Sequence, residues 1–145
     1  MTPQEMLNRV DIILEDSKAG ILSTATADGT PHMRWLTPLI LKQRPGCIYA
    51  VTAPGSAKTI DIESSPKVEW MLQTRGLTEV VNLKGTVTAV DNPALKSEIF
   101  DILGPRLTVF WKANPEKEEF IVLETVIKEG TWFRPMKGIR ERVKF

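Results

Sequence analysis

The segment from Thr52 to Lys58 carries the clearest chemical pattern in the chain. Thr52 ends an apolar run, Gly55 permits a tight turn, and Ser56 offers a hydroxyl where a helix is predicted to begin. The first backbone N–H groups of a helix have no partner within it and lie at the positive end of its dipole. Lys58 lies in the first turn of this predicted helix, where its positive charge is unfavourable beside the positive end of the helix dipole. A bound anion would neutralise both the lysine and the dipole. The segment therefore predicts a phosphate-binding cradle, and the same residues also fit a well-capped surface helix.

Arg34 is the second candidate for binding an anion. In the strand-like run from Pro31, side chains alternate between two faces, so His32, Arg34 and Leu36 share one face. An arginine in the middle of a strand is poorly placed unless its planar fork of five donors meets an anion. We expect Arg34 to bind the same phosphate. We expect His32 beside it to be a surface residue or one whose hydrogen bonds are satisfied within the protein.

Other chemistries find little support in the sequence. It holds none of the common glycine-rich nucleotide motifs, and one histidine with one cysteine, Cys47, does not make an ordinary zinc site. The carboxylates Asp61 and Glu63 have no spacing that separates them from solvated surface. No metal is expected, and no catalytic residue is assigned.

Length, charge and composition restrict the class of protein. The chain of 145 residues and 16.3 kDa predicts a single domain over residues 1–145. Nineteen basic residues against eighteen acidic ones give a net charge of +1, which does not favour nucleic acid, although residues 134–145 hold five bases and one acid. The lone Cys47 needs no oxidising compartment, and no apolar run reaches membrane length, so we expect a cytoplasmic protein that binds no membrane.

The elements that must position these residues follow from patterning. Thr2, Pro3 and Glu5 begin an amphipathic helix of about four turns. Strands are predicted over residues 19–26, 31–41, 47–52, 67–73, 79–90, 120–128 and 131–134. Further helices are predicted over 57–64, with Ile60 on the apolar side, from 93 to 103, and as a short piece over 105–111. Short turns between most strands favour an antiparallel, mainly β barrel or sandwich with flanking helices.

The motifs described above, in this order, resemble a known family. Arg34 before an apolar strand, Thr52 at the end of the next strand, and Ser56, Ala57 and Lys58 opening a helix resemble the pyridoxamine 5′-phosphate oxidase-like FMN-binding split barrel. Residues 64–68, Ser-Ser-Pro-Lys-Val, lead into the next strand in the same way. Size and the helix-first layout are similar to the general stress protein-type members. The resemblance implies an antiparallel split β-barrel that forms a homodimer with FMN at the subunit interface.

The resemblance also implies roles for particular residues. Arg34 and Lys58, with the hydroxyls of Thr52 and Ser56, would hold the FMN phosphate. The implied contacts to the isoalloxazine ring are the backbone at Trp35 and Leu36, and, from the other subunit, Trp132 and Arg142.

Four positions depart from the pattern of the larger oxidases. Ala57 stands where they have a second basic residue, and Val80 stands nearest to their glutamine on the fifth strand. Their substrate-binding Arg and His fall at Gly138 and Arg140. The resemblance therefore does not carry vitamin B6 oxidation to this chain.

The expected function is that of an FMN-dependent oxidoreductase that passes electrons from a reduced nicotinamide to a small acceptor, with the cofactor supplying the redox chemistry. Three alternatives remain open: a flavin-binding or stress protein without turnover, the same fold with deazaflavin or haem, and an interaction module that uses its basic tail. Trp35, Trp70 and Trp111 are expected in the core or at a dimer interface.

Overall fold

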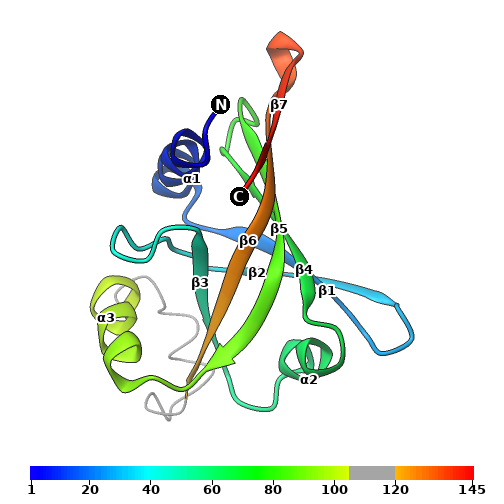
Figure 1. The fold of residues 1–145 in the computed structure, drawn as a ribbon, viewed down its shortest axis with the longest axis vertical. Coiled ribbons are helices and arrows are strands. Elements are labelled where there is room, and N and C mark those ends of the chain that lie inside the picture. The colour runs from blue at the N-terminus through cyan, green and yellow to red at the C-terminus, as the bar shows by residue number, and fades with distance from the viewer. Residues whose placement is uncertain (105–119) are drawn as a thin grey trace.

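The fold is described from a computed structural model, which describes residues 1–104 and 120–145. Within these residues the elements are α1 (Pro3–Ser17), β1 (Gly20–Ala25), β2 (Pro31–Leu36), β3 (Cys47–Thr52), α2 (Ala57–Ser64), β4 (Lys67–Gln73), β5 (Val80–Val90), α3 (Pro93–Leu103), β6 (Ile121–Arg134), the 3-10 turn η2 (Pro135–Lys137) and β7 (Ile139–Lys144). Figure 1 shows the curved sheet with the helices around it. The mainly β prediction with flanking helices is confirmed.

The strands form one antiparallel sheet. Its order is β2-β1-β4-β5-β6-β3, and β7 pairs with β6. The two end strands approach each other where the chain beyond β2 meets β3, because Leu39 and Tyr49 exchange backbone hydrogen bonds of 2.9 and 2.8 Å. This bridge closes the curved sheet into a split barrel. β2 ends at Leu36, earlier than predicted, since Pro38 interrupts the run and has no N–H for a ladder.

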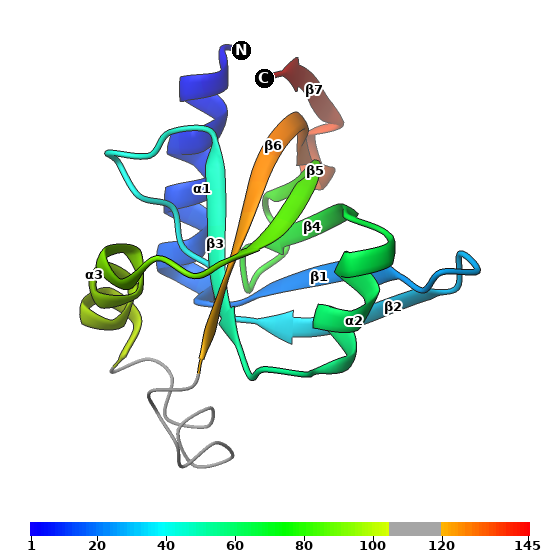
Figure 2. The same cartoon turned by 60° about the horizontal axis from the view of Figure 1, so that its bottom comes forward.

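The three α-helices of the described residues cover different parts of the sheet (Figure 2). α1 begins with the predicted capping box, in which Thr2 and Glu5 bond each other's backbone, and it buries one apolar face against the strands. α3 covers a separate apolar cluster over β3 and β6, which includes Tyr49 and Ile99. α2 packs against β1 and β5. None of the helices in the described part of the chain is long and apolar enough to cross a bilayer.

β6 is one continuous strand, not the two predicted strands joined at Glu129 and Gly130. Gly130 lies within the strand opposite Leu83 and Val143. A Cβ at this position would lie 3.1 Å from the Leu83 side chain and 3.3 Å from that of Met6. The glycine therefore allows a close approach of α1 to the sheet and does not mark a turn.

The pairing of β5 and β6 shifts register between Lys84 and Gly85. A Cβ on Gly85 would lie only 2.3 Å from the carbonyl oxygen of Val126, so no other residue fits without movement of backbone. This bulge bends the two longest strands and gives the sheet the curvature that brings β2 and β3 together.

The basic tail is not a free extension. Residues 139–144 form β7, which pairs with β6 from Glu129 opposite Lys144 to Arg134 opposite Ile139. Sequence patterning missed this strand because Val143 is its only buried residue. The tail thus adds an edge strand to the sheet.

One prediction about an apolar residue also needs correction. Ile60 is 62% exposed, while Thr59, Asp61 and Ile62 form the buried side of α2. Isoleucines two residues apart lie on nearly opposite sides of a helix, so only one of them can be buried.

The tryptophans differ in their exposure. Trp70 is fully buried, as predicted, whereas Trp35 is 78% exposed and does not belong to the core of this chain. The predicted helical piece over 105–111, including Trp111, lies outside the described residues.

Candidate functional site

A β-hairpin places Arg34 on the sheet. The predicted turn at Asp28 and Gly29 forms, with Thr26 N–H bonded to the carbonyl of Thr30 at 2.9 Å. The Asp28 carboxylate accepts the backbone N–H and the hydroxyl of Thr30, which stiffens the turn. The resulting register of β1 and β2 sets Arg34 opposite Leu22, and His32 opposite Thr24.

Arg34 is held in one orientation by β1. Its NH1 group donates to the carbonyl of Leu22 at 3.2 Å and to Thr24 Oγ1 at 2.7 Å, and its NH2 group lies 3.8 Å from Asp61 Oδ2. Burial lowers the pKa of Arg34 and the nearby carboxylate opposes that shift, while a guanidinium stays charged in proteins. Within residues 1–104 and 120–145 no hydrogen bond is seen from Nε, so the side chain keeps donor capacity for a ligand.

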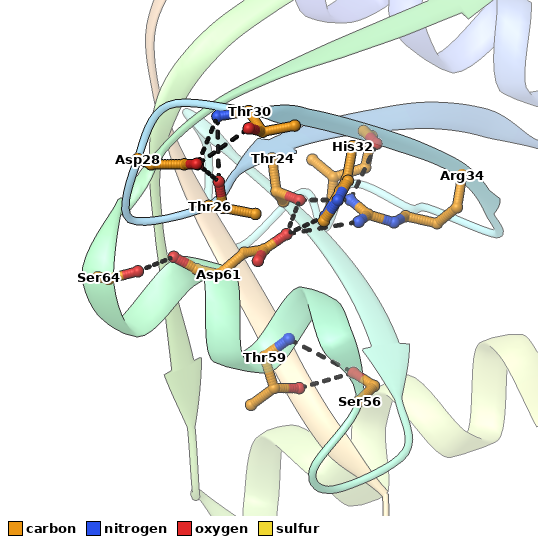
Figure 3. A network of polar contacts seen from close by, with 11 residues as sticks. Thr24, Thr26, Asp28, Thr30, His32, Arg34, Ser56, Thr59, Asp61 and Ser64 are labelled. Carbon is orange, nitrogen blue, oxygen red and sulfur yellow. Dashed lines mark hydrogen bonds and ion pairs between the residues drawn. The ribbon is translucent and has the colours of Figure 1, made fainter.

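Asp61 joins helix α2 to both strands of the hairpin (Figure 3). Its Oδ2 atom accepts the Thr24 hydroxyl and His32 Nδ1, each at 2.9 Å. Hydrogen bonds from His32 and Thr24 lower the pKa of Asp61, and the carboxylate only accepts, so the proton lies on Nδ1 of His32. The prediction that Asp61 belongs to solvated surface is wrong, because only 5% of the residue is exposed.

The beginning of α2 carries a chain of hydroxyls. Ser56 caps the helix, and its Oγ lies 3.4 Å from the backbone N of Thr59, 2.8 Å from Thr59 Oγ1 and 3.3 Å from Thr52 Oγ1. Thr52 and Ser56 are thus adjacent, as a shared phosphate contact requires. The N–H groups of Ala57 and Lys58, for which no partner is seen in the described part of the chain, lie beside them.

Lys58 supplies the second cation. It is half-buried in the first turn of α2. Burial lowers its pKa, and the positive charge of Arg34 lowers it further. No ion pair of Lys58 is seen in the described part of the chain. Two cations that repel each other at a helix N-terminus form an arrangement that an anion would stabilise.

The backbone at Trp35 and Leu36 lies on an end strand. Among the described strands β2 pairs only with β1, so its other edge is open along this stretch. Trp35 also lines a cavity of about 290 Å³ together with Gly20, Ile21 and Met71. A planar ring bound at Trp35 would therefore contact both the open edge of β2 and an apolar surface.

Trp132 and Arg142 lie elsewhere in the chain. Trp132 is half-buried and donates its indole N–H to Glu79 at 2.9 Å. Arg142 is exposed and pairs with Glu129 at 3.0 Å. Arg142 is opposite Thr131 in the β6–β7 register, so Trp132 and Arg142 point to opposite faces of the sheet. Within one chain the structure does not bring either residue to the Arg34 and Lys58 cluster.

The positions that depart from the larger oxidases have their own surroundings. Val80 begins β5 opposite Gln73 and Phe133. The Arg140 guanidinium lies 4.7 Å from the centre of the Phe133 ring. The side chain of Arg140 thus lies against an aromatic ring of its own chain.

Sequence reasoning missed Thr24 and Asp61 as parts of the site. The clearest sequence signal for the burial of Asp61 was the spacing of Ser56, Thr59 and Ile62, which identifies the buried side of α2. Asp61 lies next to that side. Among the described residues no three His, Cys, Asp or Glu side chains gather as ligands for a metal ion.

Comparisons with known proteins match this arrangement. The family model described as pyridoxamine 5′-phosphate oxidase matches residues 6–132. No curated protein matches the chain.

Several solved structures share the fold. A NimC/NimA family protein from Clostridium acetobutylicum is 21% identical, with a TM-score of 0.77 over 99% of this chain and 94% of that one. A protein from the same organism related to general stress protein 26 of Bacillus subtilis is 13% identical, with a TM-score of 0.74 over 100% and 97%. A pyridoxamine 5′-phosphate oxidase-related, FMN binding protein from Nostoc punctiforme is 15% identical, with a TM-score of 0.63 over 96% and 86%. The family model matches most of the chain, from residue 6 to residue 132, and the solved structures share its split-barrel fold. The chain therefore belongs to the pyridoxamine 5′-phosphate oxidase family.

Proposed function

We propose that the chain is an FMN-binding oxidoreductase that works as a two-fold homodimer and passes electrons from a reduced nicotinamide to a small acceptor. The observation that carries the cofactor assignment is Lys58, a half-buried cation in the first turn of α2 with no ion pair in the described part of the chain, together with Arg34, whose Nε makes no hydrogen bond among the same residues. Burial lowers the pKa of Lys58, and the charge of Arg34 lowers it further. A phosphate monoester carries close to two negative charges at neutral pH and would offset both cations.

Each residue of the cluster has a separate task in this proposal. Arg34 donates to the phosphate through the N–H groups that Leu22 and Thr24 leave free, and Lys58 adds a point charge. Ser56 and Thr52 contribute hydroxyls, and the first backbone N–H groups of α2 complete the cradle. FMN, when bound, supplies the hydride chemistry, and the protein positions its ring along the open edge of β2 at Trp35 and Leu36.

The homodimer is proposed from one face of the sheet that carries exposed apolar side chains. Across the strands, Arg142, Thr131, Asn82, Met71, Ile21 and Trp35 are successive neighbours in register and therefore share a face. Trp35, with Met33 at 69% exposure and Met71 at 38%, places large apolar surface there. A second copy on this face would bury these side chains and bring Arg142 of each chain toward the ring in the other, because one two-fold interface makes two equivalent sites. Trp132, in contrast, is engaged by Glu79 within its own chain.

A flavin titration tests the cofactor assignment. The purified protein is expected to show flavin absorption bands, or, if it is colourless, to quench FMN fluorescence with saturation at one FMN per chain. Sedimentation analysis is expected to give a dimer, and Trp35→Glu is expected to give monomers. The absence of saturable binding at micromolar FMN contradicts the proposal.

A kinetic measurement tests the reaction separately. Steady-state oxidation of NADH or NADPH by the FMN-loaded dimer is expected to exceed that by free FMN. A loaded protein that leaves the nicotinamide untouched would be a flavin-binding protein without turnover.

A further inference from the structure

The acidic side chain of Asp61 is out of place in a site that binds an anion. Its carboxylate is nearly buried and lies 3.8 Å from the guanidinium of Arg34. A negative charge there repels a phosphate group and weakens the attraction that Arg34 and Lys58 exert. Its presence calls for a role that outweighs this repulsion.

The geometry points to Asp61 as a positioning residue for the phosphate-binding cluster, an inference that rests on the function proposed above. One oxygen, Oδ2, accepts from Thr24 on β1 and from His32 on β2 while Asp61 itself belongs to α2. The two halves of the cradle are Arg34 on β2 and the N-terminus of α2. Asp61 ties these halves together.

Thr24 transmits the orientation to Arg34. Its hydroxyl accepts from Arg34 NH1 at 2.7 Å and donates to Asp61 Oδ2 at 2.9 Å, so the carboxylate fixes the direction of the hydroxyl proton. Without Asp61 the hydroxyl is free to rotate and compete for other partners. Arg34 is a long side chain with many rotamers, and locking it before the ligand arrives lowers the entropic cost of binding.

His32 provides the second tie. Its Nδ1 bonds to the same oxygen, and its position opposite Thr24 places it on the strand that carries Arg34. Because Asp61 accepts from both strands of the hairpin, a shift of α2 would break both bonds at once. The distance between Arg34 and the helix N-terminus is thereby held constant.

The test compares FMN with riboflavin, which has the same ring system and no phosphate. Positioning of Arg34 affects only the ligand that carries a phosphate. We expect Asp61→Leu to weaken FMN binding about tenfold, because Arg34 would lose its charge-assisted contact with the phosphate. Riboflavin binding is expected to stay unchanged. Asp61→Asn keeps an oxygen acceptor and is expected to lose less. Thr24→Val, which removes the hydroxyl between Arg34 and Asp61, is expected to resemble Asp61→Leu.

Glu63→Leu is the matched control, because Glu63 is an exposed carboxylate on the same helix. It is expected to leave both ligands unaffected. If Asp61 acts only as a negative charge, Asp61→Asn and Asp61→Leu will bind FMN more tightly than the wild type, since a repulsion is removed. If it acts only in folding, the ratio of FMN to riboflavin affinity in the folded variants will not change. Either result overturns the inference, and Thr24→Val provides the decision if the Asp61 variants do not fold.

Inorganic phosphate separates this inference from the proposed function. Phosphate is titrated into the wild type and the variants, and the backbone N–H signals of Ala57 and Lys58 are followed by NMR. If phosphate shifts these signals in the wild type and Asp61→Leu abolishes the effect, positioning holds even where FMN does not bind and the proposed function fails. A wild type that binds neither FMN nor phosphate overturns both.

Discussion

Two nearly buried carboxylates, Asp61 before the start of β4 and Glu79 after its end, make a comparison possible within one molecule. Glu79 accepts from Arg9, whose Nε lies at 2.8 Å and whose NH2 group bonds the same oxygen, and from the indole of Trp132. Asp61 accepts from a threonine and a histidine, and its arginine remains 3.8 Å away. Arg9 therefore bonds the Glu79 carboxylate directly, whereas Arg34 makes no hydrogen bond to Asp61 and keeps donors free.

The pKa shifts describe the same difference. Burial would raise the pKa of Glu79, but hydrogen bonds from Arg9 and Trp132 lower it, and the charges of Arg9 and Arg134 lower it further. At the other cluster burial lowers the pKa of Lys58, and the positive charge of Arg34 lowers it further. In the Glu79 cluster the arginines stabilise a carboxylate, which is typical of a structural ion pair. In the Asp61 cluster Lys58 has no ion pair among the described residues, and the function proposed above gives it an anionic partner.

The largest expected effect belongs to the structural cluster. Glu79→Leu leaves Arg9 and the Trp132 indole without their acceptor, and we expect a loss of about 3 kcal/mol in the free energy of unfolding. Urea denaturation followed by tryptophan fluorescence measures it, with Glu63→Leu as an exposed control. The folded variant is expected to bind FMN as the wild type does. Weakened FMN binding in the folded variant would mean that the Glu79 cluster also supports the cofactor site, so that the two clusters are not independent.

Lys58→Ala is expected to weaken FMN binding without a loss of stability, the reverse of Glu79→Leu. The removal of one charge-assisted contact to phosphate lowers FMN affinity by about tenfold to a hundredfold, or roughly 1.5–3 kcal/mol. The stability of the protein is expected to stay the same or to rise slightly, because the repulsion of Arg34 disappears. Fluorescence titration measures the affinity, and Lys42→Ala in an exposed loop is the control. An unchanged affinity would place the phosphate elsewhere.

Acid is expected to weaken both clusters. Asp61 and Glu79 have lowered pKa values in the folded state, so each contributes stability that is present above the ordinary carboxylate pKa and is lost as the pH falls through the folded value. Unfolding free energy is therefore expected to fall below about pH 5. Glu79→Gln and Asp61→Asn should each flatten this dependence when urea unfolding is measured from pH 7 to pH 3. Equal slopes in wild type and variants would show that other carboxylates dominate.

Alkali is expected to affect only the Asp61 cluster, and this is the smallest effect. Lys58 must be protonated to bind phosphate, and its lowered pKa means that FMN affinity falls as the pH rises through that value, below the usual lysine range. Riboflavin titrations correct for changes in the flavin ring itself. The Lys58→Arg variant keeps its charge at these pH values and should remove the dependence. A pH profile that is the same in the wild type and in this variant would mean that another group titrates.

Local sequence signals determined much of this protein. The capping box at Thr2 and Glu5, the Asp28-Gly29 turn and the Ser56 cap each act over three or four residues, and each forms as predicted. The strands at 47–52 and 67–73 and the helix at 57–64 have the predicted bounds for the same reason. The sequence also predicted that Arg34 lies in a strand and Lys58 in the first turn of a helix, and both positions are as predicted.

Only the tertiary structure decided which residues meet. Gly130 resembles a turn in sequence and proves to be a contact between β6 and α1. Asp61 resembles surface acid until α2 docks on the hairpin and brings it to Thr24 and His32, 37 and 29 residues away. Local patterns set the conformation of a segment because the interactions are short-range. The partners of a buried charge depend on long-range packing, which no spacing in the chain reports.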